Sequence, residues 1–438
     1  MPVHRAAAIA LAGAVACASA LPRGGDQPGS DPDAVSAADR SDQPVRVALA
    51  IAARSPKIGG TGSWAIYNRN SANLVTRGTA GTTMRVERRN GQLVAIREDG
   101  SVTSRFTGPL IVRAATPGTF LTHEGKRYRG EFVITPSADA ILVVNRLGVE
   151  SYLRGVVPLE IGNRIAGEEA AVEAQAVAAR SYSYIKMAEA GSRAFDMYSS
   201  VQDQVYGGAD AEKPMADAAV ATTANMVLRY GGRIVNTPYS STCGGSTAAV
   251  QEVWWRESPK PHLQPVSDRV PGSDKFYCDA SPRFRWTSTF EKSELKETLE
   301  KYLGQYTRGA EPSVAPNPTA PRVSVGTVRS SRVEGRTASD RVSTLSVQTS
   351  GGNYALRGND IRFVLRTPTG TILNSTYFTA ETTIDGSGEV SRLTLRGGGY
   401  GHGIGMCQWG AIGRARAGQD YRTILTTYYP GTTVGSVN

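Results

Sequence analysis

Long apolar runs are scarce in this chain of 438 residues. Beyond the N-terminus no segment is apolar over the roughly 20 residues that a membrane-spanning helix needs. Dense runs of Lys and Arg are also missing, as are nucleic-acid-binding motifs, and this argues against a nucleic-acid partner. Histidine and cysteine are rare, with four of each. Their spacing does not match a zinc finger.

The composition that remains is ordinary for a folded protein, with 40% hydrophobic and 20% charged residues. The length suits one large domain with insertions, or two to three packed lobes. The 48 Gly and 23 Pro residues favour many turns and a strand-rich chain. A formal net charge of +10 fits an acidic partner, such as an anionic wall polymer, and equally fits a role in solubility alone.

The N-terminus resembles a secretory signal. Arg5 precedes an apolar stretch at 6–16, and Ala18-Ser19-Ala20 follows as a small-residue cleavage site. We therefore expect a signal peptide at 1–20, a disordered Gly/Asp/Ser/Pro-rich linker at 21–42, and export to the cell envelope, periplasm or cell wall. Lipidation of Cys17 is the alternative to simple cleavage.

Two kinds of segment follow the linker. Short β-type runs separated by turn residues fill 43–147 and predict an N-terminal β-rich module. A core at 148–438 starts with an Ala-rich helix at 168–190, which lacks Gly and Pro and stops at Gly191. Further helices are predicted at 213–225, 291–302 and 421–427, with a strand-rich insertion at about 287–392. The expected class is α+β: β-rich, with the Ala-rich helix buried.

The segment YLRGVVPLE at 152–160 is the first candidate for chemistry. It combines an apolar, strand-like run with the carboxylate of Glu160. Apolar surroundings raise the pKa of a carboxyl group, and a Glu protonated at neutral pH can act as a general acid on a glycosidic bond. The structural alternative is that Glu160 caps the following helix or pairs with Arg180.

A glycine-rich segment at 397–410 surrounds His402. Glycines let the backbone approach another group closely. The segment lacks the Gly-Lys-Ser/Thr ending of a phosphate loop and the βαβ context of a dinucleotide site. His402 is therefore a candidate metal ligand, proton carrier or sugar contact, or a structural residue.

Removal of the signal peptide would leave Cys243, Cys278 and Cys407. An odd number of cysteines in an exported protein implies a free thiol, an intermolecular bond or a metal site. A Cys243–Cys278 disulfide, a zinc site formed by the three cysteines with or without His402, and free thiols all remain open.

Four segments together resemble the SpoIID/LytB family, the stage II sporulation protein D and amidase-enhancer group. They are YLRGVVPLE at 152–160, EAQAVAARSY at 173–182, STCGG at 241–245, and GHGIGMCQWGA at 401–411 with YYPGT at 428–432. The resemblance spans roughly 45–432. It implies that the β module packs on a SpoIID-like catalytic core.

The resemblance also implies a lytic transglycosylase that cleaves MurNAc–GlcNAc strands stripped of peptides. Glu160 would be its acid and base, and no cofactor would be required, while the cysteine set described above leaves zinc as an option. The expected groove residues are Gln175, Arg180, Tyr206, Ser241, Thr242, His402 and Gln408. Two other functions compete: a wall-binding enhancer whose partner is a cell-wall amidase, and a zinc-dependent hydrolase.

Overall fold

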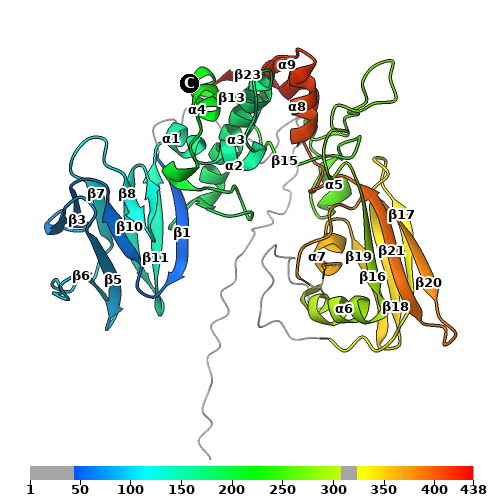
Figure 1. The fold of residues 1–438 in the computed structure, drawn as a ribbon, viewed down its shortest axis with the longest axis horizontal. Helices are drawn as coiled ribbons and strands as arrows, with labels where there is room; N and C mark the ends of the chain where they lie inside the picture. The colour runs from blue at the N-terminus through cyan, green and yellow to red at the C-terminus, as the bar shows by residue number, and fades with distance from the viewer. Residues whose placement is uncertain (1–43, 307–322, 368, 438) are drawn as a thin grey trace, which may run out of the picture.

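The computed structural model describes residues 44–306, 323–367 and 369–437. The expected signal peptide, the linker and Cys17 lie outside these residues. The fold is α+β, as expected: two β-rich lobes lie on opposite sides of a helical region (Figure 1). Among the described helices, none has the length and apolar character to span a membrane.

The N-terminal lobe consists of two sheets, and both contribute fully buried strand residues to the core. A seven-stranded sheet has the order β12-β1-β11-β10-β7-β3-β4, and a five-stranded sheet has the order β6-β5-β2-β8-β9. In the first strand, Val45 and Val47 point into the core. The strands are β1 (Val45–Ala53), β2 (Lys57–Gly60), β3 (Trp64–Asn68), β4 (Leu74–Gly78), β5 (Thr83–Arg89), β6 (Gln92–Arg97), β7 (Leu110–Ala114), β8 (Leu121–His123), β9 (Lys126–Tyr128), β10 (Glu131–Ser137), β11 (Ala140–Leu147) and β12 (Met197–Tyr198).

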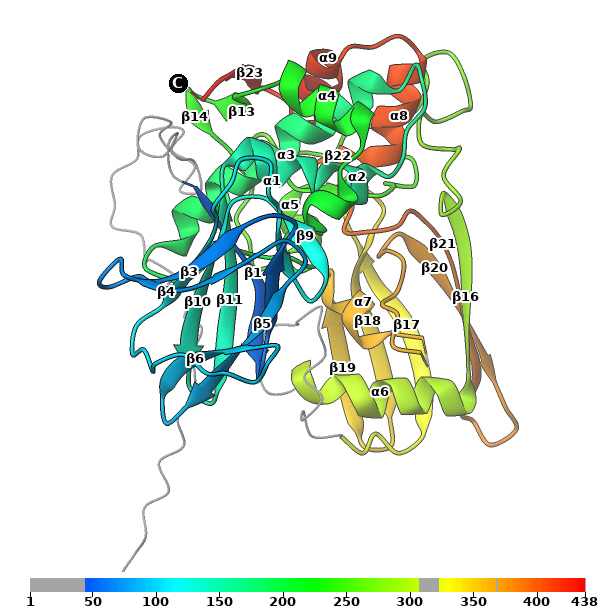
Figure 2. The same ribbon diagram turned by 60° about the vertical axis from the view of Figure 1, so that its left-hand side comes forward.

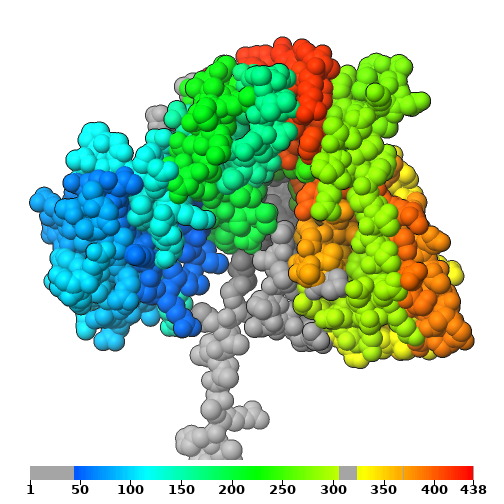
Figure 3. Space-filling model, in the orientation of Figure 1, coloured from blue at the N-terminus to red at the C-terminus, as the bar shows by residue number. Residues whose placement is uncertain are grey.

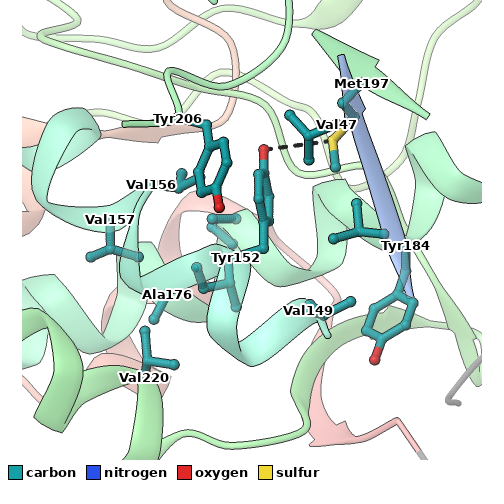
Figure 4. Close-up of a cluster of buried hydrophobic side chains, with 14 of the residues drawn as sticks. Val47, Val149, Tyr152, Val156, Val157, Ala176, Tyr184, Met197, Tyr206 and Val220 are labelled. Atoms are coloured by element: carbon teal, nitrogen blue, oxygen red, sulfur yellow. Dashed lines mark hydrogen bonds between the residues drawn. The ribbon is translucent and has the colours of Figure 1, made fainter. Parts of the chain in front are cut away.

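This lobe and the helical region share one hydrophobic core. The strand β12, which follows the Ala-rich helix in the chain, pairs in parallel with β1. Figure 4 shows Tyr152 between Tyr206 and Met197, with its hydroxyl 3.9 Å from the Met197 sulfur. Side chains from both parts of the chain therefore meet in a continuous apolar cluster.

The 150–160 segment is helical, so the expectation of a strand-like run was wrong. It forms α1 (Val149–Arg154) and α2 (Val157–Ile161), with Pro158 in the first turn of α2. Tyr152, Leu153, Val156 and Val157 are all buried. Tyr152 and Leu153 lie on α1, Val156 precedes α2 and Val157 begins it, so these buried positions come from two short helices that pack into the same core.

The prediction of an Ala-rich buried helix is confirmed by α3 (Glu169–Ala190). Small side chains such as Ala174, Ala176 and Ala178 are fully buried and let neighbouring helices approach closely. The helix ends at Gly191, whose φ of 54° favours glycine. Around it lie η2 (Gly208–Ala211), α4 (Pro214–Thr222), β13 (Met226–Tyr230), β14 (Arg233–Ile234), β15 (Tyr239–Ser240), α5 (Val250–Val253), β22 (Met406–Cys407), α8 (Gln408–Arg416), α9 (Tyr421–Tyr428) and β23 (Thr433–Ser436).

The second β-rich lobe has its own hydrophobic core. It contains two three-stranded sheets, β16-β21-β20 and β17-β18-β19. Helix α6 lies against these sheets (Figure 2), and the lobe occupies the end of the molecule opposite the N-terminal sheets (Figure 3). Its elements are β16 (Arg285–Glu291), α6 (Lys292–Tyr306), β17 (Val328–Arg336), β18 (Val342–Thr349), β19 (Gly352–Arg357), α7 (Asp360–Val364), β20 (Phe378–Ile384) and β21 (Val390–Gly398).

Candidate functional site

A cleft of about 860 Å³ lies where the helical region faces α7 of the second lobe. Its walls come from α2, α3, the 201–204 loop, β15, the segment after α5, and the glycine-rich segment before β22. Three of the residues expected at the site, other than Glu160, line it: Ser241, His402 and Gln408. Tertiary packing therefore brings together segments that are up to about 250 residues apart in the sequence.

Glu160 lies at this cleft on α2, partly buried. Its Oε1 accepts a hydrogen bond from the Val205 N–H at 2.8 Å. Its own backbone carbonyl accepts from Gln408 Nε2 at 3.0 Å. Glu160 does not form an ion pair with Arg180, which pairs with Glu150 instead. The Val205 N–H therefore orients the carboxyl group, while Gln408 holds the backbone of Glu160.

Burial raises the pKa of Glu160 to about 7, and the hydrogen bond from Val205 only partly opposes this. No second carboxylate among the described residues contributes to the shift. A substantial fraction of Glu160 is therefore protonated at neutral pH. Such a group can donate a proton and later accept one.

Neutral polar side chains form part of the cleft wall beside this carboxyl group. Gln204 Nε2 donates to the Tyr239 hydroxyl at 2.9 Å, while Gln204 Oε1 accepts from Tyr152 at 3.2 Å and Ser183 at 3.1 Å. Burial first, and the charge of Glu160 second, hold the pKa of Tyr239 well above its usual value. Gln204 and Tyr239 both line the cleft. Their hydrogen bonds keep the wall next to Glu160 rigid without adding charge.

His402 is a neutral imidazole. Its Nδ1 accepts from the Ile404 N–H at 3.0 Å, and its ring also bonds to the Tyr239 backbone. Burial, together with the positive charge of Arg362, lowers its pKa to about 3. The ring lies 5.2 Å from that of Trp254, centroid to centroid. Because both nitrogens are engaged by backbone, His402 can offer its ring face to a ligand but is poorly suited to carry protons.

Gln408 connects the cleft to the buried Ala-rich helix. Its Nε2 donates to Gln175 Oε1 at 3.1 Å as well as to the Glu160 carbonyl. Gln175 itself is fully buried and does not line the cleft. Gln175 therefore contacts the site through Gln408 and sets the orientation of the Gln408 amide.

Three other expected groove residues lie away from the cleft. Arg180 is fully buried and binds both carboxylate oxygens of Glu150 at 2.8 Å. Tyr206 packs against Tyr152 and donates to Asn145 at 2.8 Å. Thr242 is 1% exposed. At these positions the three residues stabilise the fold.

Aromatic and arginine side chains that the sequence patterns did not single out also line the cleft. Trp254 and Phe363 are two of the aromatic residues in its wall, and Arg256 and Arg362 add positive charge. Burial lowers the pKa of Arg362 only to about 10, so it stays charged at neutral pH. No local motif marks these residues, since they come from segments that only the fold brings together.

The three described cysteines come together behind the cleft. Cys243, Cys278 and Cys407 are buried and unbonded, and Asp268 joins them. The Cys243 and Cys278 sulfurs are 3.6 Å apart, whereas a disulfide needs about 2.05 Å. The Cys243–Cys278 disulfide considered above is thus absent from this structure, and His402 is not part of the group.

Comparison with known proteins identifies two regions. Residues 137–230 match the SpoIID model, described as stage II sporulation protein, and 271–405 match a domain of unknown function (DUF8618). An amidase enhancer of Bacillus subtilis (strain 168) is 34% identical over 310 residues, which are 65% of this chain and 40% of that protein. Stage II sporulation protein D of the same organism is 27% identical over 310 residues, 67% of this chain and 76% of that protein.

These findings support the SpoIID/LytB family, whose SpoIID model matches residues 137–230. An uncharacterized protein of Brachyspira hyodysenteriae is 28% identical over 401 residues, covering 90% of this chain and 93% of that protein. The SpoIID match runs from β10 to β13 and includes Glu160 and the α3 helix. The matched domain of unknown function covers most of the second lobe and supplies the α7 wall of the cleft.

Proposed function

We propose that this SpoIID/LytB protein is a lytic transglycosylase that cleaves MurNAc–GlcNAc bonds in peptide-stripped peptidoglycan. The observation that carries the proposal is the carboxyl group of Glu160, which faces the cleft with a pKa of about 7. Its relatives named for sporulation and for amidase enhancement support a role at the cell wall.

In the proposed reaction Glu160 acts twice. Its carboxyl group first protonates the glycosidic oxygen as the bond from that oxygen to the muramic C1 breaks. The resulting carboxylate then takes the proton from the muramic 6-hydroxyl as its oxygen bonds to C1. The product is a 1,6-anhydro ring, and Glu160 is protonated again at the end. Neither water nor a second carboxylate takes part.

Among the described residues no other carboxylate shifts the pKa of Glu160, and this favours the proposed reaction over ordinary hydrolysis. Asp203, Glu257 and Asp360 also line the cleft, and Asp203 accepts hydrogen bonds from the Tyr182 hydroxyl and the Tyr198 N–H. Glycosidases generally use two carboxyl groups about 5–10 Å apart, one as acid and one as base or nucleophile. Two such groups would raise each other's pKa. The pKa of Glu160 is raised by burial alone within the part of the chain that the structure describes.

The remaining wall of the cleft suits a glycan that lacks peptides. Removal of the stem peptide leaves a lactyl carboxylate on each muramic residue, and Arg256 and Arg362 place positive charge on the wall. Trp254, which packs against His402, offers an aromatic face for a sugar ring. An apolar face with a few charged groups is typical of a ligand site.

The test compares wild-type protein with Glu160→Gln on peptide-stripped and on whole peptidoglycan, with anhydro-muramic products measured by mass spectrometry. Glu189→Gln is the matched control, because Glu189 is exposed at the end of α3 and pairs with Lys186. We expect products from the wild type and Glu189→Gln on stripped glycan, and none from Glu160→Gln. Equal amounts of product from the wild type and both variants would show that Glu160 is not the catalytic acid.

A wall-binding enhancer of an amidase is the second candidate, favoured by the similarity to the Bacillus subtilis amidase enhancer. The net charge of +10 also suits attachment to an anionic wall. This function predicts no anhydro products from any variant, together with wall binding and amidase stimulation that both survive Glu160→Gln.

A further inference from the structure

Four side chains meet behind the wall of the cleft, and the proposed reaction uses none of them. Cys243 follows β15, Cys407 ends β22, and Asp268 and Cys278 lie between α5 and β16. All four are buried, and one ligand atom from each lies within 4.8 Å of the others. Such a group of three sulfurs and a carboxylate can hold a metal ion.

We propose that Cys243, Asp268, Cys278 and Cys407 bind one zinc ion in a closed, structural site. Two thiolates on a tetrahedral zinc, each about 2.3 Å from the metal, lie about 3.8 Å apart. The 3.6 Å between the Cys243 and Cys278 sulfurs is close to this value. Thiolate ligands favour zinc over magnesium or calcium. Four protein ligands leave no open position for a substrate or water.

Backbone N–H groups point at two of the sulfurs. Cys407 Sγ accepts from the N–H of Cys243 at 3.1 Å and of Gly410 at 3.3 Å. Cys243 Sγ accepts from the Gly245 N–H at 3.4 Å. Hydrogen bonds of this kind stabilise negative charge on a ligand sulfur and fix its orientation. The sulfurs are thus placed as thiolates would be.

Asp268 is oriented by one of its two oxygens. Its Oδ1 accepts from the Tyr428 hydroxyl at 2.6 Å and from Arg414 Nη2 at 3.1 Å. Its Oδ2 lies 3.5 Å from the Cys243 sulfur, on the side of the cysteines. A carboxylate held this way has one oxygen for its hydrogen-bond partners and one for a metal.

The charge of the surroundings also fits an anionic centre. Three thiolates, a carboxylate and Zn²⁺ sum to a negative site. Arg341, 1% exposed, donates to the carbonyls of Cys243 at 3.1 Å and Ser246 at 3.2 Å. Its Nε and Nη1 have no hydrogen-bond partner, and within the described residues no carboxylate pairs with it. Burial of a guanidinium that forms no ion pair is costly, and a thiolate centre would add to the negative charge that Glu252 already places near Arg341.

Zinc at this position would hold the wall of the cleft from behind. Strands β15 and β22 pair in parallel, with Ser240 opposite Cys407. The same short segments carry Ser241, His402 and Gln408 to the cleft. The ion would join these strands to the loops that carry Asp268 and Cys278, so its role is to position the wall.

The test uses full-length protein purified without a metal-affinity tag. Its metal content is measured by elemental mass spectrometry. We expect stoichiometric zinc in the wild type and in Glu160→Gln. Cys407→Ser and Asp268→Asn should bind zinc at least about tenfold more weakly. Leu345→Ala removes a buried side chain from the core of the second lobe. It should keep its zinc, which separates loss of ligands from loss of stability.

Cobalt provides a readout that does not depend on activity. Exchange of zinc for Co²⁺ in the wild type should produce thiolate-to-cobalt absorption, and Cys407→Ser should weaken it. A metal-free wild type would overturn the proposal, whether alkylation finds three free thiols or a Cys243–Cys278 disulfide. Because Glu160→Gln should lack cleavage but retain zinc, the two proposals fail separately.

Discussion

Replacing Glu160 with Gln should stabilise the protein at alkaline pH and change its stability little near pH 4. The folded state keeps this carboxyl group partly buried, which disfavours its charged form. The unfolded chain ionises it freely. Gln has nearly the same shape but never becomes charged, so the variant avoids the cost of ionisation.

The size of the effect follows from the pKa. A rise from the ordinary value of 4.5 to about 7 corresponds to about 3 kcal/mol, since each pKa unit is worth about 1.4 kcal/mol. Below pH 4.5 the group is protonated in both states and imposes no penalty. As the pH rises from 4.5 to about 7, the unfolded chain loses the proton first, and the wild type loses stability relative to the variant. Above pH 7 the full difference applies.

The measurement is the free energy of unfolding in urea from pH 4 to pH 8.5, taken as wild type minus Glu160→Gln. Glu98→Gln is a control of opposite sign, because hydrogen bonds from Thr83 lower the pKa of the exposed Glu98. Its wild-type-minus-variant difference should rise with pH. Parallel curves for wild type and Glu160→Gln across the whole range would refute a raised pKa for Glu160.

Three further predictions follow from the site. Cleavage should fall about tenfold per pH unit above pH 7, because the acid form of Glu160 is lost; a flat pH–rate profile to pH 9 would exclude it as the acid. Arg180→Met should lower the free energy of unfolding by about 3 kcal/mol, since it leaves Glu150 without its partner. The KM of Arg180→Met for glycan should stay unchanged. A selective rise in KM would indicate that Arg180 contacts the glycan in the groove. Trp254→Ala should raise KM about fivefold, or about 1 kcal/mol, with kcat retained; an unchanged KM would mean that sugars do not stack beside His402.

Much of the secondary structure could be predicted because its signals are local. The Ala-rich run matches α3 with its end at Gly191, and the helix predicted at 421–427 matches α9. The 150–160 segment was misjudged because apolar and β-branched residues dominate it, whereas it forms two short helices. Packing against α3 and α4 outweighs β propensity in such short helices.

At the candidate site, the sequence marked Glu160, His402, Ser241 and Gln408, and all four line one cleft. The segments of His402, Ser241 and Gln408 are dense in Gly and polar residues, and Glu160 is a lone carboxylate in an apolar run, so both signals are local. Trp254 and the arginines of the second lobe could not be found this way. They belong to segments with no motif of their own.

By itself, the sequence indicated an α+β chain similar to the SpoIID/LytB family, with one candidate catalytic carboxyl group and four motif segments. Tertiary structure alone decided that Arg180 pairs with Glu150, that His402 is neutral, and that Asp268 joins the cysteines. The reason is physical. Residue type and period are local properties, whereas burial, pKa and the choice of a partner depend on which distant segments pack together.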